Sequence, residues 1–327
     1  MKCRKLGWTD LDITEIGFGA WAVGGEDSPF GWGPQDDNDS IAAIHKALDL
    51  GINWIDTAAI YGFGHSEKVV AKAIKGKRKE IIIATKCSRV WDEKREVFSS
   101  LKRDSVLREC EESLQRLETD YIDLYQIHWP GDEERLEEGW ETMNTLIKSG
   151  KVRYGGVSNF DIGQMSRIQH LHPIASLQPP YSMMRRAVEA EIFPYCEENK
   201  IGVVAYSPMQ AGLLTGRFDR NRIAKTDWRQ GQVEFNEPNL EVNLWFVDQL
   251  RPIADKYQKT VAQLALSWTL RLNVVTSSIA GARNPQQVID NVGGSGWTID
   301  LDDLQTIENL LEERAQRVEK AGGVVRT

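Results

Sequence analysis

Short apolar runs and amphipathic segments alternate along almost the whole chain, and this alternation limits the possible folds more than any other feature. Eight apolar runs have the length of strands, at residues 15–18, 54–55, 81–84, 121–127, 154–157, 176–178, 203–205 and 274–276. Apolar residues at helical spacing lie between them, for example in residues 39–50, 105–117, 136–149 and 187–199. Strands that alternate with helices pair in parallel through right-handed crossovers, and about eight such strands close a barrel. The sequence therefore predicts an α/β fold, a (β/α)8 TIM barrel.

Three further segments refine this prediction. Residues 4–15 carry turn signals between short alternating runs, and they predict an N-terminal hairpin that closes the bottom of the barrel. Residues 301–317 predict a C-terminal extra helix with an amphipathic pattern. Residues 219–239 exceed the usual length of a loop between a strand and a helix, and such a loop at a barrel mouth is expected to be a functional lid. Because no linker, repeat or low-complexity tract interrupts the chain, residues 1–327 are expected to form one domain.

Capping residues mark the ends of the first predicted helix. Asn38 or Asp39 is the expected N-cap, and Gly51 is the expected C-terminal stop. Asp36 and Asp37 precede them, but the segment lacks the glycine and the distal glutamate of a calcium loop. We therefore expect these carboxylates to cap the helix and bind no metal.

The charge balance and the cysteine spacing disfavour several classes of function. The formal net charge is -8, which argues against nucleic acid or an anionic membrane as a general partner. The four cysteines show no C-x-x-C spacing, and no carboxylate or thiol partner accompanies His170 and His172, so no metal site is predicted. The N-terminus lacks an apolar signal core, and no run approaches about eighteen apolar residues. These observations favour a cytoplasmic protein with reduced thiols.

Ionisable residues follow three of the strand-like runs. Asp56 and Tyr61 lie in the segment WIDTAAIYG, at the end of the second run. Lys86 follows the third run, and His128 follows the fourth. Because the carboxyl ends of barrel strands meet at one face, where barrel enzymes hold their catalytic residues, we expect these four side chains to meet there.

These four residue types suit the reduction of a carbonyl, which needs a hydride on carbon and a proton on oxygen. A phenol is a weak acid at neutral pH, since its unperturbed pKa is about 10. Lys86 is the candidate ammonium that lowers the pKa of Tyr61, and Asp56 would hold Lys86 by a charge-assisted hydrogen bond. Tyr61 would then be the general acid in reduction, and His128 would donate to the carbonyl oxygen. An alternative is an aldolase that uses Lys86 as a Schiff-base nucleophile, although a nearby aspartate would keep this lysine protonated.

In these motifs the chain resembles the aldo-keto reductase superfamily, and it looks closest to the bacterial branch that also resembles potassium-channel β subunits. The resemblance extends over nearly the full length, from GFGAW near residue 17 to residues 283–291. Asp56, Tyr61, Lys86 and His128 match the family's catalytic tetrad residue for residue. The resemblance implies an NADPH-dependent reductase of aldehydes or ketones. It also permits an alternative, a regulatory subunit that senses nucleotide and turns over slowly.

The loops after the last two strands are suited to a phosphate-bearing cofactor. No G-x-G-x-x-G motif follows the first strand, so a Rossmann domain is not the nucleotide module. A barrel can instead bind phosphate with these two loops and a nearby helix N-terminus. Gly212 and Gly216 would let backbone N–H groups approach an anion, and Arg217 adds charge. Asn284 is an expected N-cap, and Pro285 suits the first helical position after it.

The resemblance implies a set of cofactor-binding residues: Gly19, Trp21, Asp56, Ser158, Asn159, Gln178, Tyr206, Ser207, Gly212, Leu213, Arg217, Gly281, Arg283, Gln287 and Asn291. Within this set, Tyr206 would stack on the nicotinamide, Asn159 would bind its carboxamide, and Arg217 would contact the pyrophosphate. Gln287 and Asn291 lie four residues apart, so they share the helix face that would contact adenine.

Arg283 carries the prediction of cofactor preference. A guanidinium near the ribose 2′ position favours a 2′-phosphate, so NADP(H) is preferred over NAD(H). Many family members have a lysine earlier in this segment, whereas residues 276–279 contain no cation here. This departure weakens the preference without reversing it.

Tryptophans gather in the loops expected around the mouth. Trp21, Trp32, Trp91 and Trp129 are the predicted substrate-binding residues. An aromatic cleft favours apolar or sugar-like carbonyl compounds, so the expected partner is a small-molecule aldehyde or ketone. No coiled-coil or apolar seam indicates an oligomer, and a monomer is expected.

Overall fold

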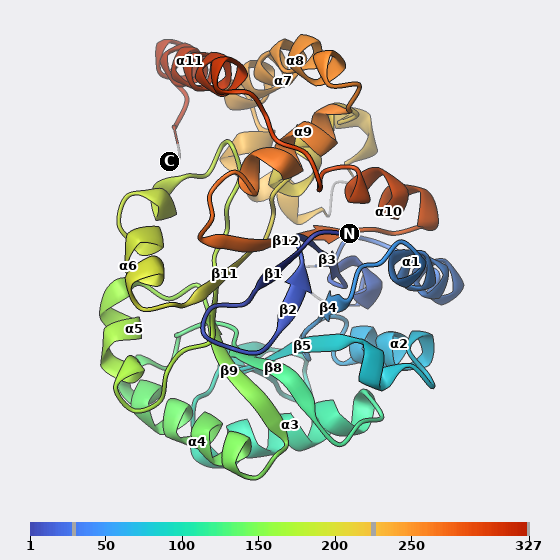
Figure 1. Cartoon of the computed structure of the whole chain (residues 1–327), viewed down its shortest axis with the longest axis vertical. Coiled ribbons are helices and arrows are strands. Elements are labelled where there is room, and N and C mark those ends of the chain that lie inside the picture. Colours follow the sequence, from blue (N-terminus) through green and yellow to red (C-terminus); the bar gives the residue numbers. More distant parts are fainter. Residues whose placement is uncertain (28–30, 224–226, 326–327) are drawn as a thin grey trace.

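Eight parallel strands form a closed barrel at the centre of the molecule (Figure 1). The computed structural model describes residues 1–27, 31–223 and 227–325. The barrel strands are β3 (Ile16–Gly19), β4 (Trp54–Asp56), β5 (Ile82–Cys87), β8 (Ile122–Ile127), β9 (Val152–Ser158), β10 (Ser176–Gln178), β11 (Gly202–Ala205) and β12 (Val275–Gly281). The barrel closes where β12 pairs with β3, with Ser278 opposite Ile16 and Gly281 opposite Gly19. The predicted TIM barrel is confirmed, and each strand overlaps its predicted run.

Helices cover the outside of the barrel between successive strands. They are α1 (Asp37–Asp49), α2 (His65–Ala73), α3 (Arg103–Arg116), α4 (Leu136–Lys148), α5 (Ile162–Gln169), α6 (Ile192–Glu198), α9 (Val261–Thr269) and α10 (Pro285–Val292). Their buried faces pack on the strands and form one large apolar core, which includes the fully buried Trp140 and Trp268.

Two predicted helix boundaries were wrong, and each has a local cause. The N-cap of α1 is Asp36, whose carboxylate accepts hydrogen bonds from the backbone N–H groups of Asn38 and Asp39. The predicted helix at residues 187–199 divides into a short 3-10 turn (Ala187–Glu189) and α6. Pro194 explains the break, because proline lacks an N–H and fits only within the first turn of a helix. Gly51 adopts a positive φ of 85° directly after Leu50, the C-cap of α1, as expected of a helix stop.

The predicted N-terminal hairpin closes the barrel at the end opposite the mouth. Strands β1 (Cys3–Lys5) and β2 (Asp12–Thr14) pair in an antiparallel manner. Leu6, Leu11 and Ile13 from this segment are buried against a second apolar cluster that includes Trp54. The guanidinium of Arg4 donates to the carbonyl oxygens of Leu270, Leu272 and Val275, which fixes the hairpin to the segment before β12.

An additional hairpin, which the sequence analysis did not predict, follows β5. It consists of β6 (Arg89–Trp91) and β7 (Val97–Ser99), which pair in an antiparallel manner before α3 begins. Ser88 joins it to β5 in a left-handed conformation with a φ of 78°. The hairpin carries Arg89 to the mouth of the barrel.

The third addition lies beyond the barrel proper, where α7 (Asn239–Gln249), α8 (Arg251–Lys256) and α11 (Leu301–Lys320) gather at one end of the molecule (Figure 1). Helix α11 confirms the predicted C-terminal extra helix, and the guanidinium of its buried Arg314 donates to Asn243 of α7. The expected lid contains short 3-10 turns at Arg220–Arg222, Trp228–Gly231 and Val233–Phe235. Residues 224–226 of that lid lie outside the described residues.

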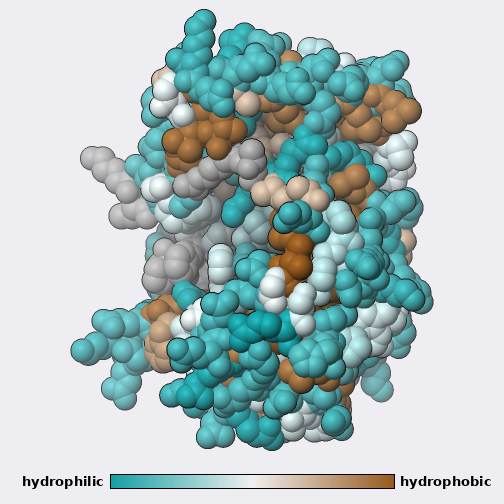
Figure 2. All heavy atoms as spheres, turned by 90° about the vertical axis from the view of Figure 1, so that its left-hand side faces the viewer, coloured by the Kyte–Doolittle hydropathy of each residue, from teal (hydrophilic) through white to brown (hydrophobic). Residues whose placement is uncertain are grey.

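The face of the molecule in Figure 2 is mostly hydrophilic, with apolar side chains in small separate patches. Within the described ranges, no helix is both long enough and apolar enough to cross a membrane.

Candidate active site

The four predicted catalytic side chains meet at the carboxyl ends of the barrel strands. Asp56 ends β4, Lys86 lies near the end of β5, His128 directly follows β8, and Tyr61 lies in the turn between β4 and α2. The Nζ of Lys86 lies 2.6 Å from Oδ1 of Asp56 and 3.5 Å from the hydroxyl oxygen of Tyr61. The Tyr61 and His128 rings are 5.8 Å apart, edge to face.

Lys86 and Asp56 form a buried ion pair beneath the cavity. The side chain of Lys86 is fully buried, and its Nζ also donates to the carbonyl oxygen of Thr57 at 2.8 Å. The second carboxylate oxygen of Asp56 accepts from Nε2 of Gln178 at 2.8 Å and from Nε2 of Gln126 at 3.5 Å. Burial lowers the pKa of Lys86, and the Asp56 carboxylate opposes that shift. Hydrogen bonds to both partners compensate part of the cost of removing them from water.

The electrostatics of Tyr61 differ from the expectation. Burial, together with the negative charge of Asp56, raises the pKa of the Tyr61 phenol well above its usual range. Lys86 was expected to lower the pKa of Tyr61. The pKa is instead raised, because the effect of desolvation outweighs that of the ammonium. The phenol keeps its proton across neutral pH, as a proton donor must. The Lys86 ammonium remains within 3.5 Å to interact with a phenolate once that proton leaves.

His128 is a neutral imidazole in this environment. Burial lowers its pKa well below the usual range, and the positive charges of Lys86 and Arg89 lower it further. A neutral imidazole has one N–H donor and one acceptor nitrogen. His128 and Tyr61 can therefore each donate one hydrogen bond to a common oxygen atom.

A cavity of about 1010 Å³ opens above these residues. Nearly all of the predicted cofactor and substrate residues line it: Gly19, Trp21, Trp32, Asp56, Trp129, Ser158, Asn159, Gln178, Tyr206, Ser207, Gly212, Arg217, Gly281, Arg283, Gln287 and Asn291. Leu213 and Trp91 do not line it. Leu213 is fully buried in the core, and Trp91 packs its ring against Phe63 at 5.3 Å.

Amide and hydroxyl groups form a fixed network on the side of the cavity nearest the tetrad. Asn159 has a left-handed backbone with a φ of 62°, and its amide donates to the carbonyl oxygen of His128 at 3.0 Å. The hydroxyl of Tyr206 donates to Oδ1 of Asn159 at 2.9 Å. The hydroxyl of Ser158 donates to the carbonyl oxygen of Gln178 at 2.9 Å. This network presents a flat aromatic ring beside polar groups of fixed orientation, which suits a planar amide-bearing ring.

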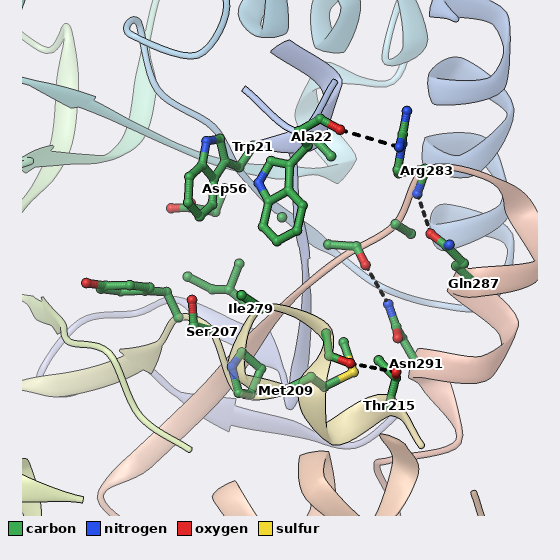
Figure 3. A pocket seen from close by; sticks show the side chains of 18 of the residues that line it. Trp21, Ala22, Asp56, Ser207, Met209, Thr215, Ile279, Arg283, Gln287 and Asn291 are labelled. Atoms are coloured by element: carbon green, nitrogen blue, oxygen red, sulfur yellow. Dashed lines mark hydrogen bonds between the residues drawn. The ribbon is translucent and has the colours of Figure 1, made fainter. Parts of the chain in front are cut away.

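The opposite side of the cavity is built by the loops after β11 and β12 (Figure 3). The first of these loops has positive φ angles at Ser207, Gln210, Ala211 and Gly212, and consecutive left-handed residues of this kind form concave backbone turns. Arg217 lies on the rim, where its guanidinium pairs with Asp290 of α10 at 3.2 Å.

Arg283 joins the loop after β12 to the loop after β3. Its guanidinium donates to Oε1 of Gln35 at 2.6 Å, to the carbonyl oxygen of Trp32 at 3.5 Å, and to the carbonyl oxygen of Pro34. Figure 3 shows Gln287 and Asn291 on the same side of α10, where they bond to Arg283 and to Gly281. Asn284 caps α10 as predicted, by accepting from the N–H of Gln287.

Three tryptophans and an arginine bring the lid segment against the loop after β3. The rings of Trp21, Trp32 and Trp228 pack on one another with centroids 5.2–5.6 Å apart. The guanidinium of Arg229 lies 5.0 Å from the Trp32 ring and donates to the carbonyl oxygen of Ala211. Asp227 binds the same guanidinium through two hydrogen bonds. The lid segment is thereby tied to the loop after β3 and to the loop after β11.

Sequence reasoning missed Arg89, Trp228 and Arg229 as site residues. The segment Asp227–Trp228–Arg229 carries a usable signal, because an aromatic residue and a cation stand together in a long loop. Arg89 stands three residues after Lys86, but its place at the mouth depends on the unpredicted hairpin.

No metal site accompanies this cavity in the part of the chain that the structure describes, where no cluster of three or more His, Cys, Asp or Glu side chains could hold an ion. The residues instead fit a dinucleotide. The cavity lies at the upper end of the usual range for ligand sites, about 300–1,000 Å³. Its lining includes the predicted tetrad residues Asp56, Tyr61 and His128, the ring of Tyr206, and Arg283 just before the N-terminus of α10.

Comparisons with known proteins agree with this assignment. The family model described as the aldo/keto reductase family matches residues 15–312. The chain is 39% identical over 316 residues to the aldo-keto reductase YhdN of Bacillus subtilis (strain 168), covering 95% of this chain and 94% of the relative. It is 35% identical over 333 residues to the NADH-specific methylglyoxal reductase of Escherichia coli (strain K12), covering 98% and 100%.

A solved structure extends the agreement to three dimensions. The glycerol dehydrogenase AKR11B4 from Gluconobacter oxydans superposes with a TM-score of 0.87 at 35% sequence identity, covering 96% of each chain. The matched family model spans all four predicted tetrad residues and the loops after β11 and β12. The resemblance found in the sequence is thus confirmed, and the chain belongs to the aldo/keto reductase family, whose members are oxidoreductases that bind a nicotinamide cofactor.

Proposed function

We propose that this protein is an NADPH-dependent reductase that converts aldehydes or ketones to alcohols. One observation carries the proposal. The Nζ of Lys86 lies between the Asp56 carboxylate, at 2.6 Å, and the Tyr61 hydroxyl, at 3.5 Å, with His128 beside them. This arrangement places a protonated acid next to a cation that can stabilise the anion it leaves behind.

Each of the four residues has a separate role in proton transfer to the substrate. Tyr61 donates its phenolic proton to the carbonyl oxygen as that oxygen gains charge. Lys86 stabilises the resulting phenolate, and Asp56 keeps Lys86 charged and fixed in position. The neutral imidazole of His128 donates a hydrogen bond to the same oxygen and orients the substrate. When bound, the nicotinamide supplies the hydride that the carbonyl carbon receives.

Arg283 supports NADP(H) as the preferred cofactor over NAD(H). Its guanidinium lies on the α10 side of the cavity, and no described carboxylate forms an ion pair with it, so it is free to meet an added phosphate. One relative is named as NADH-specific, which argues for the opposite preference. The absence of a second cation at residues 276–279 leaves Arg283 to carry this preference without help.

The remaining sites follow from the same arrangement. Tyr206 would stack on the nicotinamide, Asn159 would bind its carboxamide, and Gln287 and Asn291 would contact adenine. Trp21, Trp32 and Trp129 would contact the substrate. Trp91 is the weakest of the four predicted substrate residues, since its ring packs against Phe63 away from the cavity.

The two alternative functions receive less support from the geometry. A Schiff-base lysine must be neutral and exposed to a substrate carbonyl, whereas Lys86 is fully buried and paired with Asp56. A nucleotide-sensing subunit needs no proton donor, so the placement of Tyr61 beside Lys86 favours an enzyme.

We further infer that the enzyme works as a cytoplasmic monomer without nucleic acid or membrane partners. The net charge of -8 disfavours polyanionic partners. All four cysteines are free thiols, as expected in a reducing compartment.

NADPH oxidation followed at 340 nm with aromatic aldehydes, sugar aldehydes and dicarbonyl compounds tests the proposal, with NADH assayed in parallel. We expect turnover with at least one of these classes and a higher kcat/KM for NADPH. Tight NADPH binding without turnover on any class would instead favour the nucleotide-sensing subunit.

A further inference from the structure

Arg89 brings a positive charge to the substrate side of the cavity. It is the first residue of β6, and it lines the cavity together with His128 and Trp129. Hydrogen bonds between Ser88 and Trp129 hold the two chain segments together, since the Ser88 hydroxyl donates to the Trp129 carbonyl oxygen and accepts from the Trp129 N–H. The backbone of Arg89 is also paired with Ser99 across the hairpin. Its position next to His128 is therefore fixed by two elements.

The guanidinium of Arg89 has few partners for its charge. It is partly buried, and its one hydrogen bond among the described residues runs from Nη1 to the Ser99 hydroxyl at 3.1 Å. No described carboxylate forms an ion pair with it. A guanidinium has five N–H donors, so most of those of Arg89 have no hydrogen-bond partner among the described residues. Burial lowers the pKa of Arg89, which is the sign of a desolvated charge without compensation.

The other cations that line the cavity are either paired with a carboxylate or lie on its opposite side. Arg217 pairs with Asp290, and Arg229 pairs with Asp227. Arg283 donates to three oxygen atoms on the opposite side of the cavity. Lys86 does not line the cavity and is paired with Asp56. Arg89 is therefore the lining cation near the tetrad that an incoming anion would meet.

We infer that Arg89 determines specificity for aldehydes that also bear a carboxylate, by binding that carboxylate while the aldehyde oxygen meets Tyr61 and His128. This inference rests on the proposed reductase function. A planar guanidinium matches a carboxylate through two parallel hydrogen bonds. One guanidinium balances the single charge of a carboxylate, whereas a phosphate dianion would require more positive charge than this side of the cavity provides. Trp129, which is partly exposed at the rim, offers an apolar surface for the body of the substrate.

The test compares substrates that differ in this charge and by one methyl group. Succinic semialdehyde and 4-carboxybenzaldehyde are each assayed against their methyl esters, with saturating NADPH and the wild-type protein. We expect kcat/KM to be at least about tenfold higher for each acid than for its ester, mainly through a lower KM, because charged hydrogen bonds contribute about 1.5–3 kcal/mol.

Variants assign the effect to Arg89. In Arg89→Met the acid-to-ester ratio of kcat/KM should fall close to one, whereas Arg89→Lys should keep part of the preference. Lys94→Met is the matched control, since Lys94 is an exposed cation in the same hairpin loop and does not line the cavity. The ratio for this control should equal that of the wild-type protein.

Four results would overturn the inference. One is an acid-to-ester ratio near one in the wild-type protein, and another is an unchanged ratio in Arg89→Met. The third is a loss of NADPH affinity in Arg89→Met that matches the loss for the acids, which would place Arg89 in the cofactor site. The fourth is a preference for an aldehyde phosphate over both acids, which would mean that Arg89 binds a phosphate rather than a carboxylate.

These outcomes are separable from a failure of the proposed function. If no aldehyde or ester is reduced, the reductase proposal fails. Binding of 4-carboxybenzaldehyde to the NADPH complex, measured by tryptophan fluorescence in wild type and Arg89→Met, then still decides whether Arg89 binds a carboxylate.

Discussion

At the scale of single residues, the hydroxyl of Tyr61 experiences opposing electrostatic influences. Burial and the Asp56 carboxylate raise its pKa well above the usual range, while the Lys86 ammonium lies 3.5 Å away. In the proposed mechanism, the first influence keeps the phenol protonated before reaction, and the second stabilises the anion formed during reaction. An acid with this combination keeps its proton until a basic oxygen arrives.

Replacement of Tyr61 by phenylalanine removes the transferable proton and preserves the ring. We expect Tyr61→Phe to lower kcat for carbonyl reduction by about 10²–10⁴-fold, the usual contribution of a general acid, with little change in NADPH affinity. Steady-state kinetics and fluorescence titration measure the two quantities. Tyr195→Phe is the control, since it removes a hydroxyl that accepts a hydrogen bond from Ser166 on the outer helices. Retention of more than about a tenth of the wild-type kcat, with chemistry rate-limiting, would refute the role of Tyr61 as the acid.

Arg283 offers a second test at the residue scale. If its guanidinium binds a 2′-phosphate, Arg283→Ala should raise KM for NADPH about 10- to 100-fold, since a charged hydrogen bond contributes about 1.5–3 kcal/mol. KM for NADH should rise far less, through the loss of the bonds to Gln35 and Pro34 alone. Parallel kinetics with the two cofactors provide the comparison. Equal increases for both cofactors would mean that Arg283 only connects the two loops.

At the scale of elements, α3 supports the end of β5 through a buried acid. The carboxylate of Glu109 accepts from the backbone N–H of Ser88 at 2.9 Å and from the hydroxyl of Ser105 at 3.1 Å. Ser88 in turn bonds to Trp129, directly after His128. Glu109 thus connects α3 to the chain segments that carry Lys86 and His128. Burial raises the pKa of this carboxyl to about 7.

The raised pKa predicts how stability changes with pH. Because Glu109 binds its proton more tightly when folded, its contribution is fully present below about pH 4.5 and is lost as the pH rises to about 7. A shift of this size corresponds to about 3 kcal/mol. The wild-type free energy of unfolding should therefore contain a component that falls between pH 4.5 and 7.

Urea denaturation of Glu109→Gln across this range measures that component. The variant carries no titratable group at this position, so its stability should fall less with pH than that of the wild type. Exposed Glu312→Gln is the control, and its pH dependence should follow the wild type. Parallel curves for wild type and Glu109→Gln would contradict the assignment of a raised pKa to Glu109.

At the scale of the whole molecule, Trp54 fills the lower part of the barrel. Its indole N–H donates to the Thr14 carbonyl oxygen and to the Ser277 hydroxyl, both at 3.2 Å. It is fully buried in the cluster that also includes Leu6, Leu11 and Ile13 of the N-terminal hairpin. One side chain therefore joins the first strands, the last strand and the hairpin.

Gly17 leaves the space that Trp54 occupies, and an added Cβ there would lie 2.2 Å from two carbons of the indole ring. We expect Gly17→Ala to lower the free energy of unfolding by about 1–3 kcal/mol, as overpacking of a core does. Urea denaturation measures the change. Gly231→Ala is the control, since nothing lies within 4 Å of the Cβ it would add. Equal stability of the two variants would show that the ring of Trp54 moves aside without cost.

Much of the molecule was predictable because its signals are local. The eight apolar runs and the helical spacing between them indicated a barrel, and the order of Asp56, Tyr61, Lys86 and His128 placed four groups at one face. The predicted helix at 187–199 was wrong because Pro194 prevents a continuous helix, and this proline is visible in the sequence. The missed hairpin β6–β7 has only three residues in each strand, too few for a clear periodicity.

The sequence by itself determined the barrel and the gathering of the tetrad, since hydrophobic periodicity and strand order are properties of the chain alone. Only the tertiary structure decided the pKa direction of Tyr61, because desolvation depends on the residues that surround the phenol. It also decided that Arg89 lines the cavity while Trp91, two residues later, packs elsewhere. Residues two apart in a strand share a face, so the strand pattern alone would not separate Arg89 from Trp91. Contacts with distant segments determine which of the two meets the site.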